Sequence, residues 1–438
     1  MKPKSRVIAN KHFSRQSSLE KALTNVNVAF FLAVREIKRS NWWTTLLIIF
    51  VMMITFLNMV FVSGILIGLV EGSVDKQKQL YTGDVIISRL REKNYIEKSR
   101  EISQYLHSLP EVRDVSSRYI EGGLIEANYK NKDRATDITD SASALIAGID
   151  PESEDAVTGL SKVVIEGEYL SPGDYDKILV GSSLLYKYNP IDTPSMRTLP
   201  NVGVGTKVRL TVGGFSREVT VKGILKSKIG EVDSRVFMTD AQLRNLIGRG
   251  DLNVDEIAVK EKNGRPETSD HIKDHLLNAG YDSVAKIQTS VEAQPKFLKD
   301  MKATFGLLGN LIGGIGIVVA SITIFIIIFV NAITRRKFIG IMKGIGIRAP
   351  SIEMSYVLQA CFYGIIGSAL GLIVIFGFLK PYFDANPINF PFSDGILSVT
   401  GGGVAIRVVV LMISTVIAGY IPAKIVVRQN TLDAILGR

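Results

Sequence analysis

The chain has 438 residues, a formal net charge of +10 and one cysteine, and 46% of its residues are hydrophobic. This length allows more than one folded unit, and a single cysteine excludes a fold held by internal disulfides. Short segments rich in lysine and arginine flank the long apolar segments. That pattern favours a membrane protein and argues against nucleic acid as a partner.

Residues 1–41 are predicted to form a basic cytoplasmic N-terminus that contains an amphipathic helix. Ser17 to Glu20 have the pattern of a helix capping box, and apolar residues then recur at every third or fourth position. Such a helix either lies in the cytoplasmic membrane interface or packs on other protein. The adjacent Trp42 and Trp43 are typical of the point where a chain enters a bilayer.

Four long apolar segments are predicted to be membrane-spanning helices. A hydrocarbon core requires about 20 apolar residues, and within lipid only a helix satisfies its own backbone groups over such a run. The first segment follows a long basic region and is itself long, so we predict an anchor that is retained, not a cleaved signal peptide. The predicted spans are residues 42–70, 303–333, 353–380 and 404–421.

Residues 71–302 are polar and lie between the first two spans, which predicts a large extracytoplasmic domain. Residues 71–159 and 250–295 alternate strand and helix patterns, which indicates two related βαβ units that pair in space as a porter-like α+β part. Residues 160–249 carry short strand patterns separated by glycines, which indicates a β-rich inserted subdomain. The predicted fold class is a bundle of four transmembrane α-helices with this α+β domain inserted between helices one and two.

The sequence shows no pattern for catalysis, for cofactor binding or for a metal centre. His271 and His275 have a spacing that can bind a metal on a helix, but no third ligand lies nearby in the sequence. We therefore interpret these two histidines as part of a solvated helix face.

Basic residues are distributed unevenly between the segments that connect the spans. The N-terminus, residues 334–352 and residues 422–438 are basic, whereas residues 381–403 contain two aspartates and no lysine or arginine. Because cytoplasmic segments carry the excess of lysine and arginine, both termini and residues 334–352 are predicted to be cytoplasmic. The large domain and the 381–403 loop would then lie outside, on the periplasmic side of a bacterial plasma (inner) membrane.

The interiors of the predicted spans contain few polar residues, and Asn58, Gln359 and Arg407 are the exceptions. Ion-coupled transporters usually carry ionisable groups at mid-membrane depth, so this composition argues against such a carrier. Glycines recur in the second and third spans, which favours close helix packing. The packing could occur between two subunits or within one.

The segment from Thr334 to Ser351 reads TRRKFIGIMKGIGIRAPS. It is short and basic, and its isoleucines and methionine can form one apolar face of a helix, which suits contact with a cytoplasmic partner. It resembles the motif that follows the second helix in FtsX-like permeases, a superfamily that includes the MacB exporter and the LolC/LolE lipoprotein-release subunits. In this chain Phe338 stands where that motif usually has an acid, and Gly344 where it usually has alanine.

Other segments extend the resemblance over most of the chain. Residues 419–424 and 430–436 are similar to the C-terminal pattern of the superfamily, and residues 34–39 are similar to its entry helix. Within the large domain, segments such as Gly148 to Glu154 and Glu166 to Leu170 look most like LolC/LolE subunits.

This resemblance implies a permease subunit of an ATP-driven ABC transporter. In this superfamily, closure of two cytoplasmic ATPase subunits moves the coupling segment, tilts the second helix and moves the exported domain, which is called mechanotransmission. The sequence contains no G-x-x-x-x-G-K-[ST] pattern, so we expect no cofactor in this chain, with ATP and Mg bound by two copies of a partner ATPase. A second permease copy or a paralogue, and membrane lipid, are the other expected partners.

Two sets of residues are candidates for function. The expected ATPase-coupling residues are Arg335, Arg336, Lys337, Ile339, Gly340, Ile341, Met342, Lys343, Gly344, Ile345 and Gly346. In lipoprotein release, acyl chains would sit between the first and second helices of paired subunits. The residues expected at that surface are Met52, Phe56, Met59, Val60, Phe61, Phe305, Leu308 and Ile312.

The favoured function is movement or release of a lipid-anchored or amphiphilic substrate, such as a lipoprotein, from the outer leaflet. One alternative is a MacB-like exporter of peptides or drugs, which would need an adaptor and an outer-membrane channel. The other is an FtsX-like subunit that regulates a cell-wall hydrolase, but the large, β-rich domain fits that function less well.

Overall fold

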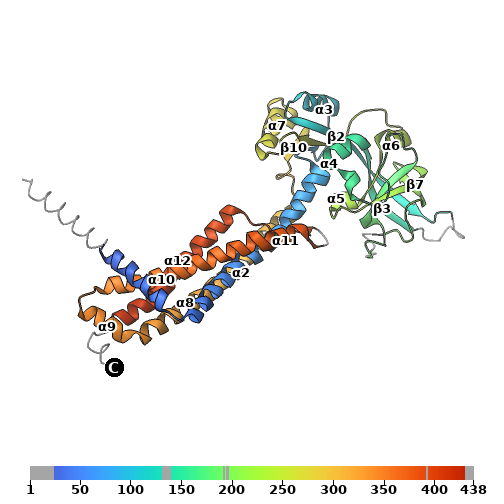
Figure 1. Cartoon of the computed structure of the whole chain (residues 1–438). Coiled ribbons are helices and arrows are strands. Elements are labelled where there is room, and N and C mark those ends of the chain that lie inside the picture. The colour runs from blue at the N-terminus through green and yellow to red at the C-terminus, as the bar shows by residue number, and fades with distance from the viewer. Residues whose placement is uncertain (1–23, 131–139, 191–192, 194–196, 391–392, 430–438) are drawn as a thin grey trace, which may run out of the picture. The chain divides into compact units, whose positions relative to one another are not determined.

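The computed structural model describes residues 24–130, 140–190, 193, 197–390 and 393–429 (Figure 1). The predicted capping box at Ser17 to Glu20 and the C-terminal motif at residues 430–436 lie outside these residues. The chain divides into two units, which we call the helical unit and the α/β unit. The helical unit comprises the described parts of Met1–Leu69, Met301–Ile388 and Gly395–Arg438, and the α/β unit comprises Val70–Asp300 and Asn389–Asp394.

Among the described residues, four helices are long and apolar enough to cross a membrane, as the sequence predicted. They are longer than the apolar runs because polar residues at the ends of a span continue the helix outside the hydrocarbon. The helices are α2 (Trp42–Gln77), α8 (Lys296–Thr334), α10 (Ala349–Val374) and α12 (Gly401–Val427). A π-helical turn, η5 (Ile375–Leu379), joins α10 to α11 (Lys380–Ala385), and the short α9 (Arg336–Gly344) connects α8 to α10.

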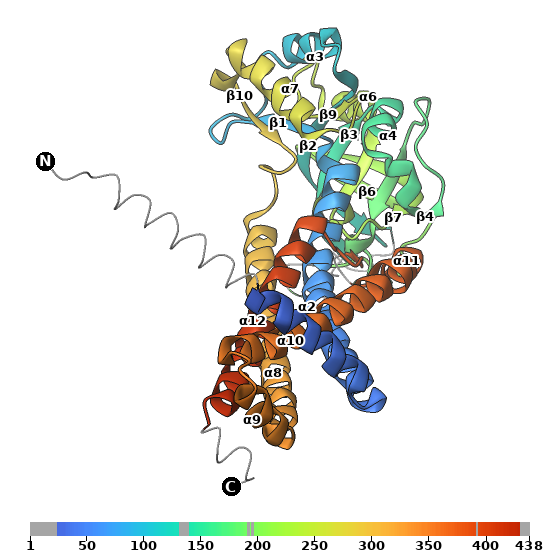
Figure 2. The ribbon, with the colours of Figure 1, turned by 60° about the vertical axis from the view of Figure 1, so that its left-hand side comes forward.

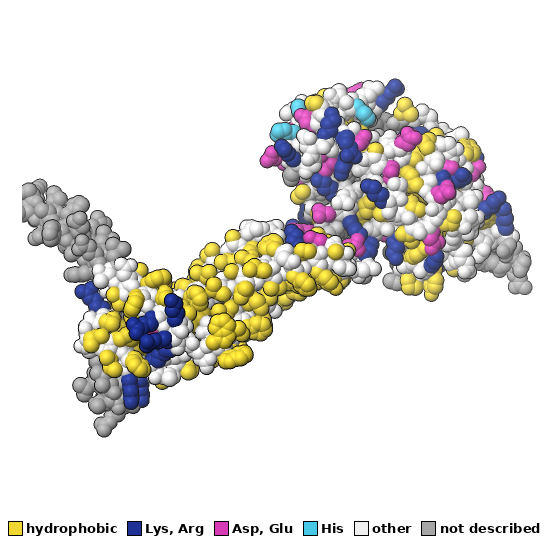
Figure 3. All heavy atoms as spheres, in the orientation of Figure 1, with side chains coloured by type: hydrophobic (Ala, Val, Ile, Leu, Met, Phe, Trp, Pro, Cys, Tyr) yellow, Lys and Arg dark blue, Asp and Glu magenta, His cyan; other side chains and the backbone are white. Residues whose placement is uncertain are grey.

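The core of the helical unit is apolar, and so is its surface. Met52, Phe56 and Tyr356 are buried among the helices, whereas large aliphatic side chains of α8 and α12 remain exposed. Figure 3 shows this apolar surface, with basic side chains gathered at the end of the bundle that contains α9. An apolar outer surface suits helices that are surrounded by lipid.

Two of the polar exceptions in the spans are paired within the helical unit. Gln359 of α10 donates a hydrogen bond to Glu36, which lies in a helix over residues 24–39. Arg407 Nη2 of α12 donates to Ser63 Oγ of α2 at 2.6 Å. These bonds satisfy polar groups that would otherwise be costly in an apolar environment.

Glycines of the third span bring α10 close to α2 within a single chain. A Cβ atom added to Gly367 would lie 2.5 Å from Met52 Cβ, and one added to Gly371 would lie 2.6 Å from Phe56 Cδ1. In the second span, Gly309 and Gly313 likewise approach Ser63 and Met59 of α2, at 2.9 and 3.0 Å, whereas Gly306 and Gly314 have no described atom within 4 Å of the corresponding position. Gly367 and Gly371 of the third span, and Gly309 and Gly313 of the second, therefore serve packing inside one chain.

The α/β unit is built on a ten-stranded sheet with the order β10-β1-β9-β2-β3-β8-β5-β7-β4, and β6 pairs with β2 and β7. The strands are β1 (Val85–Arg89), β2 (Val112–Ala127), β3 (Asp140–Ile149), β4 (Val164–Gly167), β5 (Lys177–Gly181), β6 (Lys207–Val212), β7 (Phe215–Leu225), β8 (Arg235–Thr239), β9 (Glu256–Glu261) and β10 (Ala285–Thr289). The helices are α3 (Ser99–Ser108), α4 (Pro151–Thr158), α5 (Gly230–Asp233), α6 (Asp240–Ile247) and α7 (Pro266–Asn278).

The two flanking βαβ segments interleave in one sheet. Strand β1 pairs antiparallel with both β10 and β9, and β9 pairs antiparallel with both β1 and β2. Helices α3 and α7 bury residues such as Ile102 and Leu276 in one shared core with these strands. Figure 2 shows the two helices on the same side of this part of the sheet.

Residues 160–249 belong to the same continuous sheet as the flanking segments. Strand β8 of this region pairs in parallel with β3, and β6 pairs with β2. The long strand β2 is what joins the two parts, since its first half pairs with β9 and its second half with β3. A second core, formed mainly by β2, β3 and β5 to β8, lies under this part of the sheet.

Candidate functional site

Helix α9 forms most of the predicted coupling segment and presents two different faces. Ile339 and Gly340 are buried against the helical unit. On the opposite side Phe338, Ile341 and Ile345 are 67%, 50% and 73% exposed. An exposed apolar cluster of this kind is typical of a surface that binds another molecule. We call Phe338, Ile341 and Ile345 the α9 apolar face.

Lys343 ties α9 to the end of α12. Its Nζ donates hydrogen bonds to the carbonyl oxygens of Val427, at 3.0 Å, and Gln429, at 2.9 Å. The last carbonyls of a helix have no partner within the helix and carry partial negative charge, so a lysine there is favourable. The segment next to the second span is therefore linked to the end of the fourth.

The turn after α9 depends on a glycine. Gly346 has φ of +96°, which favours glycine, and Ile347 N donates to Met342 O at 3.0 Å across the turn. Helix α10 then begins at Ala349 with Pro350 in its first turn. This turn separates α9 from α10, whereas the junction between α8 and α9 lies at Arg335.

The remaining residues of the predicted coupling set lie in α9 or next to it. Arg335, Arg336, Met342 and Lys343 are half-buried, whereas Lys337 and Gly344 are exposed. Arg335 lies near Glu36, a residue that the sequence analysis did not single out. Burial raises the pKa of the Glu36 carboxyl, while the charge of Arg335 and the hydrogen bond from Gln359 oppose that rise. Glu36 thus supplies an acid near the start of α9 in a chain where Phe338 replaces the usual one.

The predicted acyl-chain residues separate into two groups. Met52, Phe56, Met59 and Val60 are buried in the core of the helical unit. Leu308 and Ile312 are exposed on α8, and Phe61 and Phe305 are partly exposed. Within one chain, the second group is the part of this set that a substrate or a second subunit can reach.

A row of glycines on α2, which the sequence analysis did not single out, contacts the loop before α12. Ser398 N donates to Gly64 O at 3.1 Å, and a Cβ atom on Gly68 would lie 1.8 Å from Ile396 O. Their four-residue spacing was the available signal, because residues at i and i+4 lie on one face of a helix. The loop therefore runs directly on the backbone of α2.

A buried ion network lies in the α/β unit, close to the residues that follow α2. Arg118 is 1% exposed, and it bonds Glu154 at 2.8 and 2.9 Å, Glu256 at 3.2 Å and the carbonyl of Tyr81 at 2.7 Å. Tyr81, in the π-helical turn η1 (Lys78–Thr82), donates to Glu256 at 2.7 Å. The network fixes this turn to strands β2 and β9 and to helix α4.

Two arginines keep the buried Glu256 ionised. Burial by itself would raise the pKa of the Glu256 carboxyl, but the charges of Arg235 and Arg118 outweigh burial and hold the pKa at about 2. Arg235 bonds the same carboxylate at 3.1 and 3.3 Å. The residues of this network are far apart in the sequence, so no local pattern could identify them.

We predict that Lys343→Met loosens the end of α12 without unfolding the helical unit. The variant loses two charge-assisted hydrogen bonds at a half-buried position, which is worth about 1 kcal/mol. Hydrogen exchange of the amides in α9 and in the last turn of α12 should become faster. Lys337→Met is the matched control, since Lys337 is exposed on the same helix; equal exchange rates in the two variants would contradict the proposed tie.

Comparisons with known proteins identify the class of protein to which this chain is similar. Residues 310–431 match the family described as FtsX-like permease C-terminal. The chain is 26% identical over 223 residues to the ABC transporter permease YtrF of Bacillus subtilis, covering 46% of this chain and 48% of the relative. It is 25% identical over 228 residues to the macrolide export ATP-binding/permease protein MacB 1 of Yersinia pestis bv. Antiqua, covering 49% of this chain and 33% of the relative.

The chain thus spans about half, or less, of the length of the curated relatives it matches. Among solved structures, the periplasmic region of MacB from Actinobacillus actinomycetemcomitans is 15% identical with a TM-score of 0.34, covering 50% of this chain and 97% of that one. The extracellular domain of the transporter YknZ from Gram-positive bacteria is 13% identical with a TM-score of 0.31, covering 47% and 99%. The family match and the curated relatives support similarity to ABC transporter permeases of the FtsX and MacB type.

Proposed function

We propose that this chain is the membrane permease subunit of an ATP-driven ABC transporter that moves an amphiphilic or lipid-anchored substrate, such as a lipoprotein, from the outer leaflet by mechanotransmission. The observation that carries the proposal is α9, whose apolar face is exposed within the region similar to FtsX-like permeases. A membrane protein gains little from an exposed apolar face beside basic residues unless another molecule covers it.

The proposed location is a bacterial inner membrane, with both termini and α9 in the cytoplasm. The basic side chains at the α9 end of the bundle support this orientation, because positive charge is retained on the cytoplasmic side (Figure 3). The α/β unit, whose strands follow α2 and precede α8 in the chain, would then lie on the periplasmic side.

The proposed partner at α9 is a cytoplasmic ATPase subunit, two copies of which bind ATP and Mg. Helix α9 follows directly after α8, and Lys343 connects it to the end of α12. A push on α9 would therefore act on the ends of two spans together. Because α8 is a continuous helix of 39 residues, it can carry that movement towards the α/β unit without an internal hinge.

The proposed contact with substrate acyl chains is the exposed side of the first part of α8. Leu308 and Ile312 are exposed there, next to the partly exposed Phe305. A second permease copy or a paralogue would cover this surface and enclose the chains. The sequence similarity to MacB supports an exporter as a second candidate, in which the same helices would move a peptide or drug.

Ile341→Glu is expected to uncouple the permease from its ATPase. A charge at the centre of the α9 apolar face must be desolvated on docking, so we expect roughly a tenfold or greater loss of co-purifying ATPase. The measurement is the amount of ATPase, and of ATP hydrolysis, recovered with the full-length chain from its host membrane.

Phe215→Glu is the matched control, because Phe215 is also exposed but lies on β7 of the α/β unit. The control should retain the ATPase. If Ile341→Glu retained as much ATPase as Phe215→Glu, α9 would not be the docking site. Native mass spectrometry of the wild-type complex separates the two substrates: an acylated protein supports lipoprotein release, and an adaptor protein supports export.

A further inference from the structure

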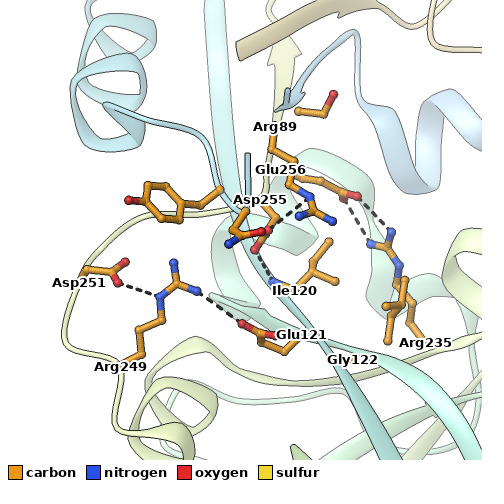
Figure 4. A pocket seen from close by; sticks show the side chains of 13 residues that line it. Arg89, Ile120, Glu121, Gly122, Arg235, Arg249, Asp251, Asp255 and Glu256 are labelled. Carbon is orange, nitrogen blue, oxygen red and sulfur yellow. Dashed lines mark hydrogen bonds and ion pairs between the residues drawn. The ribbon is translucent and has the colours of Figure 1, made fainter. Parts of the chain in front are cut away.

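A cavity of about 710 Å³ opens in the α/β unit, and its volume is in the range of small-molecule binding sites. Strands β1, β2, β3, β8 and β9 and the loop after α6 contribute to it (Figure 4). The lining residues that carry charge are Arg89, Glu121, Arg235, Arg249, Asp251, Asp255 and Glu256. A cavity lined by this many charged residues does not suit an acyl chain and fits a polar ligand. Its residues are also different from those of the acyl-chain surface proposed on α8.

Most of these charges already have close partners. Arg235 is bonded to Glu256 at 3.1 Å, and Arg249 bonds Asp251 at 2.7 Å and the hydroxyl of Tyr119 at 2.7 Å. Figure 4 shows these pairs at the sides of the cavity. These paired side chains shape the cavity. A ligand could bind one of them only if an existing bond between the pair were broken.

Asp255 and Arg89 differ from the other pairs. Asp255 is buried, and its Oδ2 accepts from Ile120 N at 2.8 Å. Its Oδ1 lies 3.8 Å from Arg89 Nε, beyond hydrogen-bonding distance. The Arg89 side chain is half exposed at the cavity and also donates to Lys93 O at 3.2 Å, which leaves further guanidinium N–H groups for an acceptor.

A ligand that carries a positive and a negative group side by side would complement Asp255 and Arg89. Asp255 Oδ2 has a donor in Ile120 N, but Oδ1 has none among the described residues within hydrogen-bonding distance and can accept from an ammonium group, while the half-exposed Arg89 guanidinium can bind a carboxylate. Burial raises the pKa of the Asp255 carboxyl to about 6, against the opposing effects of Ile120 N, Arg89 and Arg249. The raised pKa means that burial disfavours the charged form of the Asp255 carboxyl, and a cationic group of a ligand would stabilise that form.

We propose that the cavity binds a free α-amino acid, whose ammonium group bonds Asp255 and whose carboxylate bonds Arg89. In an α-amino acid the two charges are separated by a single carbon atom, which matches the adjacent positions of the two side chains. The rest of the cavity leaves room for a polar side chain near Glu121 and Arg249. Such a site gives the α/β unit a ligand of its own, separate from the membrane substrate.

The test uses the full-length protein in lipid nanodiscs. The twenty proteinogenic L-amino acids are screened one at a time by thermal shift, and the strongest is measured by calorimetry. We expect saturable binding by at least one polar amino acid. Its N-acetyl derivative, which lacks the ammonium group, and its α-amide, which lacks the carboxylate, should each bind at least tenfold more weakly.

Asp255→Asn should weaken binding at least tenfold, and Asp282→Asn, the same change at an exposed residue of the same unit, should not. Arg89→Gln gives a second variant at a half-exposed position, which keeps the test decisive if Asp255→Asn does not fold. Affinity should also fall as the pH is lowered through about 6, since Asp255 then takes up a proton. Glu121, Arg89 and Arg249 are the charged groups that contribute to that titration.

Three results would overturn the proposal. The first is that no amino acid shows saturable binding to the wild-type protein. The second is that the blocked derivatives bind as well as the free amino acid. The third is that folded Asp255→Asn or Arg89→Gln binds as tightly as the wild type. Each result is independent of whether the chain couples to an ATPase.

Discussion

Replacing Arg118 by methionine is expected to lower the free energy of unfolding of the α/β unit by about 3–5 kcal/mol. Arg118 is buried with Glu154 and Glu256, and its loss would leave the carboxylate of Glu154 buried without its cation. Ser116 and Thr158 would still donate to Glu154, at 2.6 and 3.0 Å, but neither can neutralise it. Pulse proteolysis of the full-length protein in a urea series measures the change.

Two further variants distinguish a buried ion pair from a general effect of the substitution. Arg113→Met changes an exposed arginine on the same strand, and we expect a change within about 0.5 kcal/mol. Adding Glu154→Gln to Arg118→Met should recover part of the stability, because no unpaired charge then remains buried. Equal losses in Arg113→Met and Arg118→Met would contradict the structural role assigned to the network.

Gly68→Ala is expected to destabilise the helical unit by about 1–3 kcal/mol. Alanine is the better helix former by about 1 kcal/mol, so a favourable change would be the ordinary expectation for an exposed site in a helix. In this chain the new Cβ would lie 1.8 Å from Ile396 O and 2.9 Å from its carbonyl carbon, which are backbone atoms. The loop before α12 must therefore move away from α2.

The measurement is the temperature at which Cys361, the single cysteine of the chain, becomes reactive towards a thiol-specific dye. Cys361 lies in α10 and is half-buried, so its reactivity reports opening of the bundle. Gly314→Ala is the matched control on α8, where no described atom lies within 4 Å of the new methyl group. It should be neutral or slightly stabilising, and an equal fall in both variants would exclude the steric explanation.

Much of the helical unit could be predicted because its signals are local. An apolar run of sufficient length specifies a helix in lipid wherever it occurs in a chain. The short helix α9 was equally predictable, since its basic and apolar residues lie within a stretch of 18 positions, from Thr334 to Ser351. The sequence did not predict which side chains of these helices are buried and which are exposed. Met52 and Leu308 belong to helices that are apolar on all sides, so no hydrophobic period separates the buried face from the exposed one.

In the α/β unit, the sequence indicated which segments are strands, but it did not indicate how they join. The sheet is continuous from β10 to β4 because β2 is long enough to pair with β9 at one end and β3 at the other. The glycine-rich composition of residues 160–249 instead favours a separate inserted subdomain. Composition reports local strand and turn preference and carries no information on pairing between distant strands.

Four long apolar segments, a large polar segment between the first two, and a short basic segment similar to one in FtsX-like permeases could all be recognised in the sequence alone. These features follow from solvent transfer and charge, which act on each segment separately. Three other features emerge only in the folded chain: the buried pairing of Arg118 with Glu154 and Glu256, the contact of Gly68 with Ile396, and the cavity beside Asp255. Each of these joins residues that are distant in the chain, so the ion pairing or the close contact exists only once folding has placed them side by side.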